Sequence, residues 1–196
     1  MSPRHRTGLN LAIVSVASLV QIANQFLFLK LNAYLFGATE DTDSLFYALT
    51  LASAVAAMLS GTISYVLVPD LVAKFEQGEE RRGWGLATFV GLLTLCISAT
   101  ASGLLAWFAL PICQMLHVEV RPGQHIQEAG FLQVFCIQIV LLTMISWAQA
   151  VLHSRHQFFW AAAGGVVGTA LQLVLLLSIG GQDVTAIAWA IVFGSA

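Results

Sequence analysis

The sequence predicts an all-α protein that crosses a membrane several times as a polytopic transmembrane helical bundle. Hydrophobic residues make up 58% of its 196 residues and charged residues only 9%, whereas soluble domains carry roughly 25% charged residues. In lipid, a backbone satisfies its hydrogen bonds only as helices or as a closed barrel. The apolar stretches are far longer than the ~10-residue segments of barrel strands, so we expect helices.

Five apolar stretches are long enough to cross the hydrocarbon core, which takes ~20 helical residues. They are residues 9–36, 44–72, 84–110, 128–152 and 158–179. A sixth stretch, 185–196, is too short to cross at about 1.5 Å per residue. We expect it to be the start of a sixth span, so that residues 1–196 form a single transmembrane domain truncated in its sixth helix. A short terminal helix lying partly in the membrane is the alternative.

Lysine and arginine residues outside the spans are unequally divided between the two sides. If every span crosses, one side carries six of them: Arg4, Arg6, Lys74, Arg81, Arg82 and Arg155. The other side carries only Arg121. Because cytoplasmic loops carry an excess of lysine and arginine, the N-terminus and the loops at 74–83 and 153–157 are predicted to be cytoplasmic.

The first predicted span carries several amides on one helical face. At ~100° per residue, Gln21, Asn24, Gln25 and Asn32 fall within ~100° of each other, and Lys30 falls on the opposite face. Amides inside a membrane either bond to neighbouring helices or line a hydrated cavity, and both interpretations stay open. Lys30 either extends its ammonium group to the interface or contacts an anionic ligand.

The fourth and fifth predicted spans carry two further patterns. In the fourth, Gln138, Ser146 and Gln149 share a face of ~80°, for which packing and cavity lining are again the two interpretations. In the fifth, the pairs Ala161-x-x-x-Gly165 and Gly164-x-x-x-Gly168 let helices approach closely. These small residues predict packing and no chemistry.

The sequence shows no pattern typical of catalysis or of metal, cofactor or nucleic-acid binding. Its three cysteines, Cys96, Cys113 and Cys136, have no C-x-x-C spacing, and neither H-E-x-x-H nor a Gly-rich phosphate loop occurs. The net charge of −2 gives no indication of a nucleic-acid partner. The histidines are divided between the two sides, so an intramembrane enzyme is the less favoured class.

The connection between the first and second spans has a distinctive order of residues. It reads Phe36-Gly37-Ala38, Thr42-Asp43, Phe46-Tyr47-Ala48, Gly61 and Val68-Pro69. This order resembles the N-terminal part of the MurJ/MviN-type flippases of the multidrug/oligosaccharidyl-lipid/polysaccharide (MOP) exporter superfamily. Residues 151–158 are similar to the short loop after that family's fourth helix, and residues 186–190 to the start of its sixth.

The resemblance implies one lobe of a two-lobed transporter with six helices per lobe. Such a protein moves a lipid-linked oligosaccharide or polysaccharide precursor, as in peptidoglycan synthesis, across the cytoplasmic (inner) membrane of a bacterium by alternating access. The implied partners are the lipid-linked sugar, membrane lipid and a C-terminal lobe. The residues expected along the substrate path are Asn24, Gln25, Asn32, Gln138 and Gln149, with Asp43 near its outer mouth.

The lipid II flippases of that family also line their cavity with arginines in the first two helices. The corresponding positions here are Ile22, Phe28 and Ala56. A pyrophosphate group normally has cationic partners, so either Lys30, the only cation within a predicted span, contacts the anionic group, or the substrate differs. A MOP-superfamily small-molecule or drug antiporter and a non-transporting membrane scaffold are the alternative functions.

Overall fold

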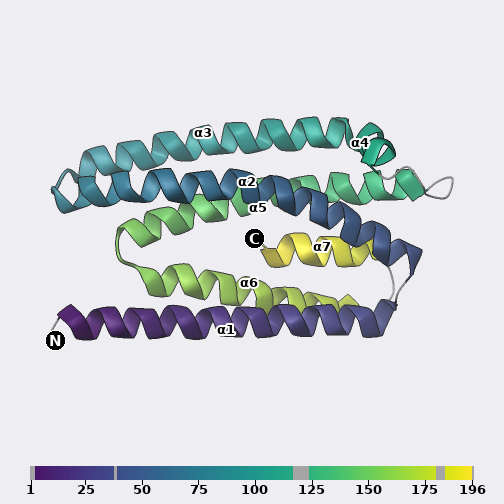
Figure 1. Ribbon diagram of the computed structural model, residues 1–196, viewed down its shortest axis with the longest axis horizontal. Coiled ribbons are helices and arrows are strands. Elements are labelled where there is room, and N and C mark those ends of the chain that lie inside the picture. The colour runs from purple at the N-terminus through teal and green to yellow at the C-terminus, as the bar shows by residue number, and fades with distance from the viewer. Residues whose placement is uncertain (1–2, 38, 117–123, 180–183, 196) are drawn as a thin grey trace.

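The computed structural model describes residues 3–37, 39–116, 124–179 and 184–195, and every regular element in these ranges is an α-helix (Figure 1). In chain order the helices are α1 Pro3–Phe36, α2 Glu40–Glu76, α3 Glu80–Trp107, α4 Ala109–Leu116, α5 Gln124–Ser154, α6 Phe158–Ile179 and α7 Val184–Ser195. Five of them, α1, α2, α3, α5 and α6, are long and apolar enough to cross a membrane. The predicted all-α bundle with five spans is thus confirmed.

Helix α6 has the predicted bounds, 158–179, whereas α1, α2, α3 and α5 begin before their predicted spans because polar residues extend them. The second helix begins at Glu40, where the hydroxyl of Thr39 accepts a hydrogen bond from the N–H of Thr42 at 3.3 Å. Acidic side chains in its first turn interact favourably with the helix dipole. The third helix ends at Trp107, before the predicted residue 110, and Pro111 lies in the first turn of α4, where proline is tolerated.

The exterior of the bundle is strongly apolar. Leu19, Tyr65 and Trp107, on three different helices, are 66%, 85% and 82% exposed, and many other large hydrophobic side chains are exposed with them. Soluble monomers rarely expose contiguous apolar patches larger than a few hundred Å². The surface therefore has the composition expected of one that faces lipid.

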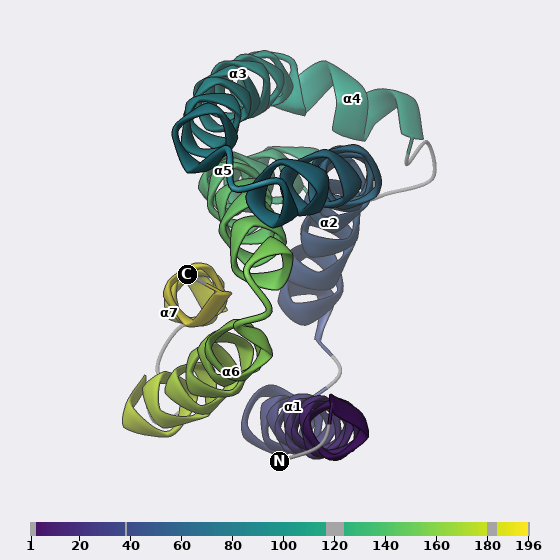
Figure 2. The same cartoon turned by 90° about the vertical axis from the view of Figure 1, so that its left-hand side faces the viewer.

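Helix α5 lies in the middle of the bundle (Figure 2). Helices α2, α3, α4, α6 and α7 all pack against it, whereas α1 packs mainly on α6. Figure 2 shows α1 and α6 together on one side of the molecule, apart from α2 and α3 on the other. This arrangement leaves α1 and α6 facing α2 and α5 across the bundle.

Helix α3 approaches α5 closely through small residues. Its buried residues are Gly83, Ala87, Gly91, Thr94, Ser98 and Ser102. A Cβ atom at Gly91 would lie 2.8 Å from the indole of Trp147, so only glycine leaves room for this ring. The Trp147 indole N–H donates to the carbonyl of Ala87 at 3.0 Å, and the Ser102 hydroxyl donates to the carbonyl of Cys136 at 2.6 Å.

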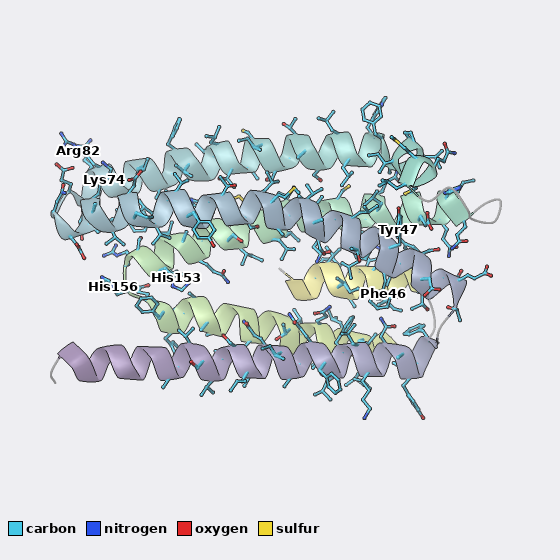
Figure 3. All side chains as sticks on the ribbon, in the orientation of Figure 1. Phe46, Tyr47, Lys74, Arg82, His153 and His156 are labelled. Carbon is cyan, nitrogen blue, oxygen red and sulfur yellow. The ribbon has the colours of Figure 1, made fainter. Side chains whose placement is uncertain are left out.

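The two ends of the bundle differ in their charged residues. Lys74, Arg81, Arg82 and Arg155 lie at one end, with the start of α1, and we call this the basic end (Figures 1 and 3). The opposite end carries the first turn of α2, with Glu40, Asp41 and Asp43, and we call it the acidic end. The larger apolar cluster of the core lies toward the acidic end and includes buried Leu45, Leu132, Phe135 and Ile187.

At the basic end, Arg155 joins two loops. One of its guanidinium nitrogens lies 3.7 Å from a carboxylate oxygen of Glu80. The guanidinium carbon lies 5.4 Å from the ring centre of Phe75 and 5.6 Å from that of Trp84, within range of cation–π attraction. The connection from α5 to α6 is thereby held against the turn between α2 and α3.

Candidate functional site

A cavity of about 760 Å³ lies between the α1–α6 pair and the α2–α5 pair. Phe46 lines it toward the acidic end, and Leu152 and Trp160 line it toward the basic end. Figure 3 shows the positions of Phe46 and His153, the neighbour of Leu152, far apart along the bundle. The cavity therefore extends along the helices to the level of the basic end, while the larger apolar cluster occupies the acidic end.

The polar side chains that line this cavity are amides and hydroxyls. They come from α1, α2, α5 and α6 and are Gln21, Gln25, Ser53, Ser60, Gln138, Ser146, Gln149, Thr169 and Gln172. No charged side chain is among the described residues that line it. Such a wall offers many hydrogen-bond donors and acceptors without any fixed charge.

The amide face of α1 both packs and lines the cavity. Gln25 lines the cavity, whereas the Asn24 amide donates to the Thr169 hydroxyl of α6 at 3.1 Å. Gln21 lines the cavity and also lies against Gly165, where a side chain would displace it. The small residue predicted for packing at 165 thus makes room for an α1 amide.

Asn32 lies on the same face of α1 but in a different environment. It is 1% exposed, and neither of its amide atoms has a hydrogen-bond partner. Leu31 and Leu35 beside it pack against the larger apolar cluster, and Asn32 does not line the cavity. Burying an unpaired amide costs about 1–3 kcal/mol, so Asn32 lowers the stability of the folded protein in the state described.

The two charged candidates lie outside the cavity wall. Asp43 is exposed in the first turn of α2, where its carboxylate interacts favourably with the helix dipole. Lys30 is exposed on α1, and neither side chain is among those that line the cavity. Lys30, for which an anion contact was one of the two predicted roles, therefore lies away from the amide-lined space.

The amides of α5 face the cavity together. Gln138, Ser146 and Gln149 all line it. Gln138 is only 6% exposed, and its amide oxygen has no hydrogen-bond partner. This pairing of burial with an unused acceptor is found at the end of the cavity's α5 wall that lies nearer the acidic end.

Apart from Ala56, which the family resemblance pointed to, sequence reasoning did not single out the α2 wall or Gln172 of α6. The α2 wall contains Ser53, Ala56, Ala57 and Ser60, at spacings i, i+3, i+4 and i+7. This period marks one face of a helix, and a search for small residues at that spacing would have found it. Gln172 stands alone in its span and gave no periodic signal.

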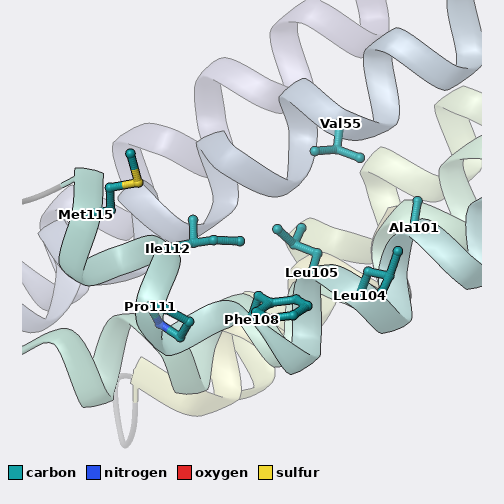
Figure 4. Close-up of a pocket in the computed structure, with 8 residues that line it drawn as sticks. All are labelled: Val55, Ala101, Leu104, Leu105, Phe108, Pro111, Ile112 and Met115. Atoms are coloured by element: carbon teal, nitrogen blue, oxygen red, sulfur yellow. The ribbon is translucent and has the colours of Figure 1, made fainter.

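Two further groups of residues lack the features of a polar binding site. A cavity of about 460 Å³ between α2, α3 and α4 is lined by Val55, Leu104, Phe108, Met115 and other apolar residues (Figure 4), so it can accommodate hydrocarbon but cannot orient a polar group.

In α4, burial and the negative charge of Glu128 raise the pKa of the Cys113 thiol, which keeps it protonated. The described residues include no group of three His, Cys, Asp or Glu that could hold a metal ion.

A comparison with protein-family models decides the family. The model described as Lipid II flippase MurJ matches residues 32–196. This chain belongs to the MurJ family. No curated protein and no solved structure matched the chain.

Membership confirms the resemblance carried by the residues between the first and second spans. The MurJ family consists of bacterial inner-membrane transporters that act on lipid II, a lipid-linked sugar precursor of peptidoglycan. The match covers α2, α5, α6 and α7 of the cavity wall, while Gln21 and Gln25 precede the matched range. Of the positions where the resemblance implied arginines, Phe28 and Ala56 line the cavity, and Ile22 is 62% exposed.

Proposed function

We propose that this chain moves a lipid-linked saccharide precursor of the peptidoglycan type across the cytoplasmic membrane by alternating access. The observation that supports this proposal is a cavity lined by amides and hydroxyls within a bundle of apolar exterior. Amides and hydroxyls can replace the water that hydrates a sugar headgroup, while the hydrocarbon tail stays in lipid. No covalent chemistry is required of the protein.

The cavity wall also argues against the alternative of a cation-coupled drug antiporter. Such an exchange needs a carboxylate in the path, because ionisable residues inside membrane proteins mark ion pathways. The described lining contains no aspartate or glutamate. A neutral polar path suits a saccharide better than a cationic drug.

In this proposal the described helices, packed around α5, act as one transmembrane domain that moves against a second lobe. The basic end faces the cytoplasm, in line with the positive-inside tendency. In this proposal the headgroup enters from the cytoplasmic side, where Leu152 and Trp160 line the cavity at the level of the basic end. Release on the other side requires a second arrangement in which the acidic end opens.

Cysteine labelling tests this orientation. In a variant without the three native cysteines, Arg81→Cys at the basic end is expected to react with a membrane-impermeant maleimide only after the inner membrane is permeabilised. Asp43→Cys at the acidic end serves as the matched site and is expected to react in cells with an intact inner membrane. The reverse pattern would show that the bundle has the opposite orientation.

A reconstitution experiment tests the transport itself. The chain is placed, together with the second lobe against which it moves, in lipid vesicles that contain a fluorescent lipid-linked disaccharide pyrophosphate, and the fraction of label accessible to a quencher outside is followed over time. Faster movement across the bilayer than in protein-free vesicles is expected. In parallel, expression of the chain with the second lobe is expected to restore growth to bacteria depleted of their own lipid II flippase; failure of both measurements would refute the proposal.

A further inference from the structure

We infer that the amide-lined cavity is a subsite for the uncharged sugar of the substrate, in which Gln138 binds a sugar hydroxyl, and that the pyrophosphate group is held outside it. This inference rests on the proposed function and specifies which part of the lipid-linked precursor the described cavity recognises. It follows from one buried side chain and from the chemistry of the wall around it.

Gln138 is a buried amide in the cavity wall. Its side chain is more than nine-tenths buried, lines the cavity, and has an amide oxygen with no hydrogen-bond partner. Ile139 and Phe135 next to it are fully buried, so the helix holds this amide in place. A buried amide that lacks a partner is unfavourable, and a ligand group that bonds to it removes that penalty.

The Gln138 amide restricts which ligand group can form a hydrogen bond with it. An amide oxygen requires a donor, and the oxygens of a pyrophosphate are acceptors only. If the amide were rotated by 180°, its NH₂ group would require an acceptor instead. A sugar hydroxyl donates and accepts and therefore satisfies Gln138 in either orientation.

The polar side chains of the α5 wall extend over a considerable length of the cavity. Gln149 lies eleven residues beyond Gln138 on α5, a distance of roughly 16 Å along the helix axis, with Ser146 between them. Gln25 of α1 lines the same cavity. A saccharide presents hydroxyl and N-acetyl groups along its whole length, so it can bond to several of these side chains at once.

The described residues that line the cavity carry no charge. Anionic phosphate oxygens are stabilised by cationic donors such as arginine and lysine, and placing them in a confined site without such partners is costly. The described lining has no cation, because the chain has Phe28 and Ala56 in this wall and Lys30 lies outside it. The cavity therefore selects the neutral part of the headgroup.

Two simplified ligands separate the sugar from the pyrophosphate. One is an alkyl glycoside of an N-acetylated disaccharide without phosphate, and the other is an alkyl pyrophosphate with the same chain and no sugar. Binding of each to the full chain in nanodiscs is measured by calorimetry, for the unchanged protein, Gln138→Leu and Gln133→Leu. Gln133 is the matched control, because it is an exposed glutamine of the same helix that does not line the cavity.

The glycoside is expected to bind the unchanged protein and Gln133→Leu equally and to bind Gln138→Leu about tenfold more weakly, the effect of one hydrogen bond. The alkyl pyrophosphate is expected neither to bind measurably nor to displace the glycoside. Displacement by the pyrophosphate, or equal glycoside affinity in Gln138→Leu, would overturn the inference, as would failure of the unchanged protein to bind the glycoside.

A second variant guards against a folding defect. Gln149→Leu changes a less buried amide of the same wall and is expected to weaken glycoside binding severalfold with an unchanged melting temperature. The vesicle experiment is independent of these measurements. Movement of the lipid-linked disaccharide without glycoside binding would reject the sugar subsite and leave the transport function standing.

Discussion

Replacement of Ser53 by tryptophan is expected to abolish movement of the lipid-linked precursor while the helical bundle stays folded. Ser53 lies on α2 in the wall of the cavity, opposite the amides of α1. An indole at this position occupies space that the proposed headgroup requires and separates it from the amides around it. Loss of three hydrogen bonds of about 1 kcal/mol each lowers the transport rate on the order of 100-fold.

The neighbouring residue provides the control. Ala54 is exposed and does not line the cavity, so Ala54→Trp adds the same ring on the side that faces lipid. The initial rate of quencher accessibility in vesicles and the melting temperature are measured for both variants. Transport at the normal rate in Ser53→Trp would show that the cavity is not the path, and a function as a scaffold would then be favoured.

The number and type of the helices could be predicted from the sequence because they depend on composition and length alone. A stretch of ~20 apolar residues requires a helix in lipid, whatever it packs against. The ends of the helices depend on local capping, as at Thr39, whose hydroxyl accepts a hydrogen bond from the N–H of Thr42 in the first turn of α2. The hydropathy pattern does not report this hydrogen bond. The predicted second span therefore began at residue 44, four residues after the start of α2 at Glu40.

The packing of α3 on α5 shows why helix contacts were harder to predict. The residues that make this contact, such as Gly91 and Ser102, are small and weakly hydrophobic, so they give little contrast within an apolar span. Their spacing becomes informative only when the partner ring of Trp147 is known. In α6, by contrast, the small pairs were visible, but Gly164 has open space where a side chain would be and Gly168 does not.

The candidate site was predictable to the extent that one helix determines it. Gln138 and Gln149 share a face of α5, and the structure places both in the cavity wall. The face shared by Asn24, Gln25 and Asn32 divides among three environments: a bond to α6, the cavity and the core. That division depends on which helix lies opposite each turn, and the role of these residues in a substrate path stays a prediction.

Gly168→Ala is expected to lower the free energy of unfolding by roughly 1–3 kcal/mol, the cost of overpacking a tight contact. A Cβ atom at Gly168 would lie 2.8 Å from the carbonyl oxygen of Gly194 in α7. Because this oxygen belongs to the backbone, no side-chain rotation relieves the clash, and α7 must move away from α6. The melting temperature in detergent or nanodiscs measures the effect.

Gly164→Ala, one turn earlier on the same helix, gives the opposite expectation. A Cβ atom there meets nothing within 4 Å, and alanine is favoured over glycine within a helix by roughly 0.5–1 kcal/mol. The melting temperature of Gly164→Ala should therefore stay unchanged or rise. Equal destabilisation of both variants would show that backbone freedom, and not the contact with α7, is what glycine provides in α6.

The same pair of variants connects packing to transport. Gly164, Gly168 and Gly194 all line the cavity, but only at Gly168 does an added Cβ atom meet the backbone of α7. A shift of α7 therefore changes the shape of the path as well as the stability of the bundle. We expect Gly168→Ala to transport more slowly than Gly164→Ala, even at a temperature where both are fully folded. A normal rate in Gly168→Ala would mean that the α6–α7 contact stabilises the bundle without shaping the path.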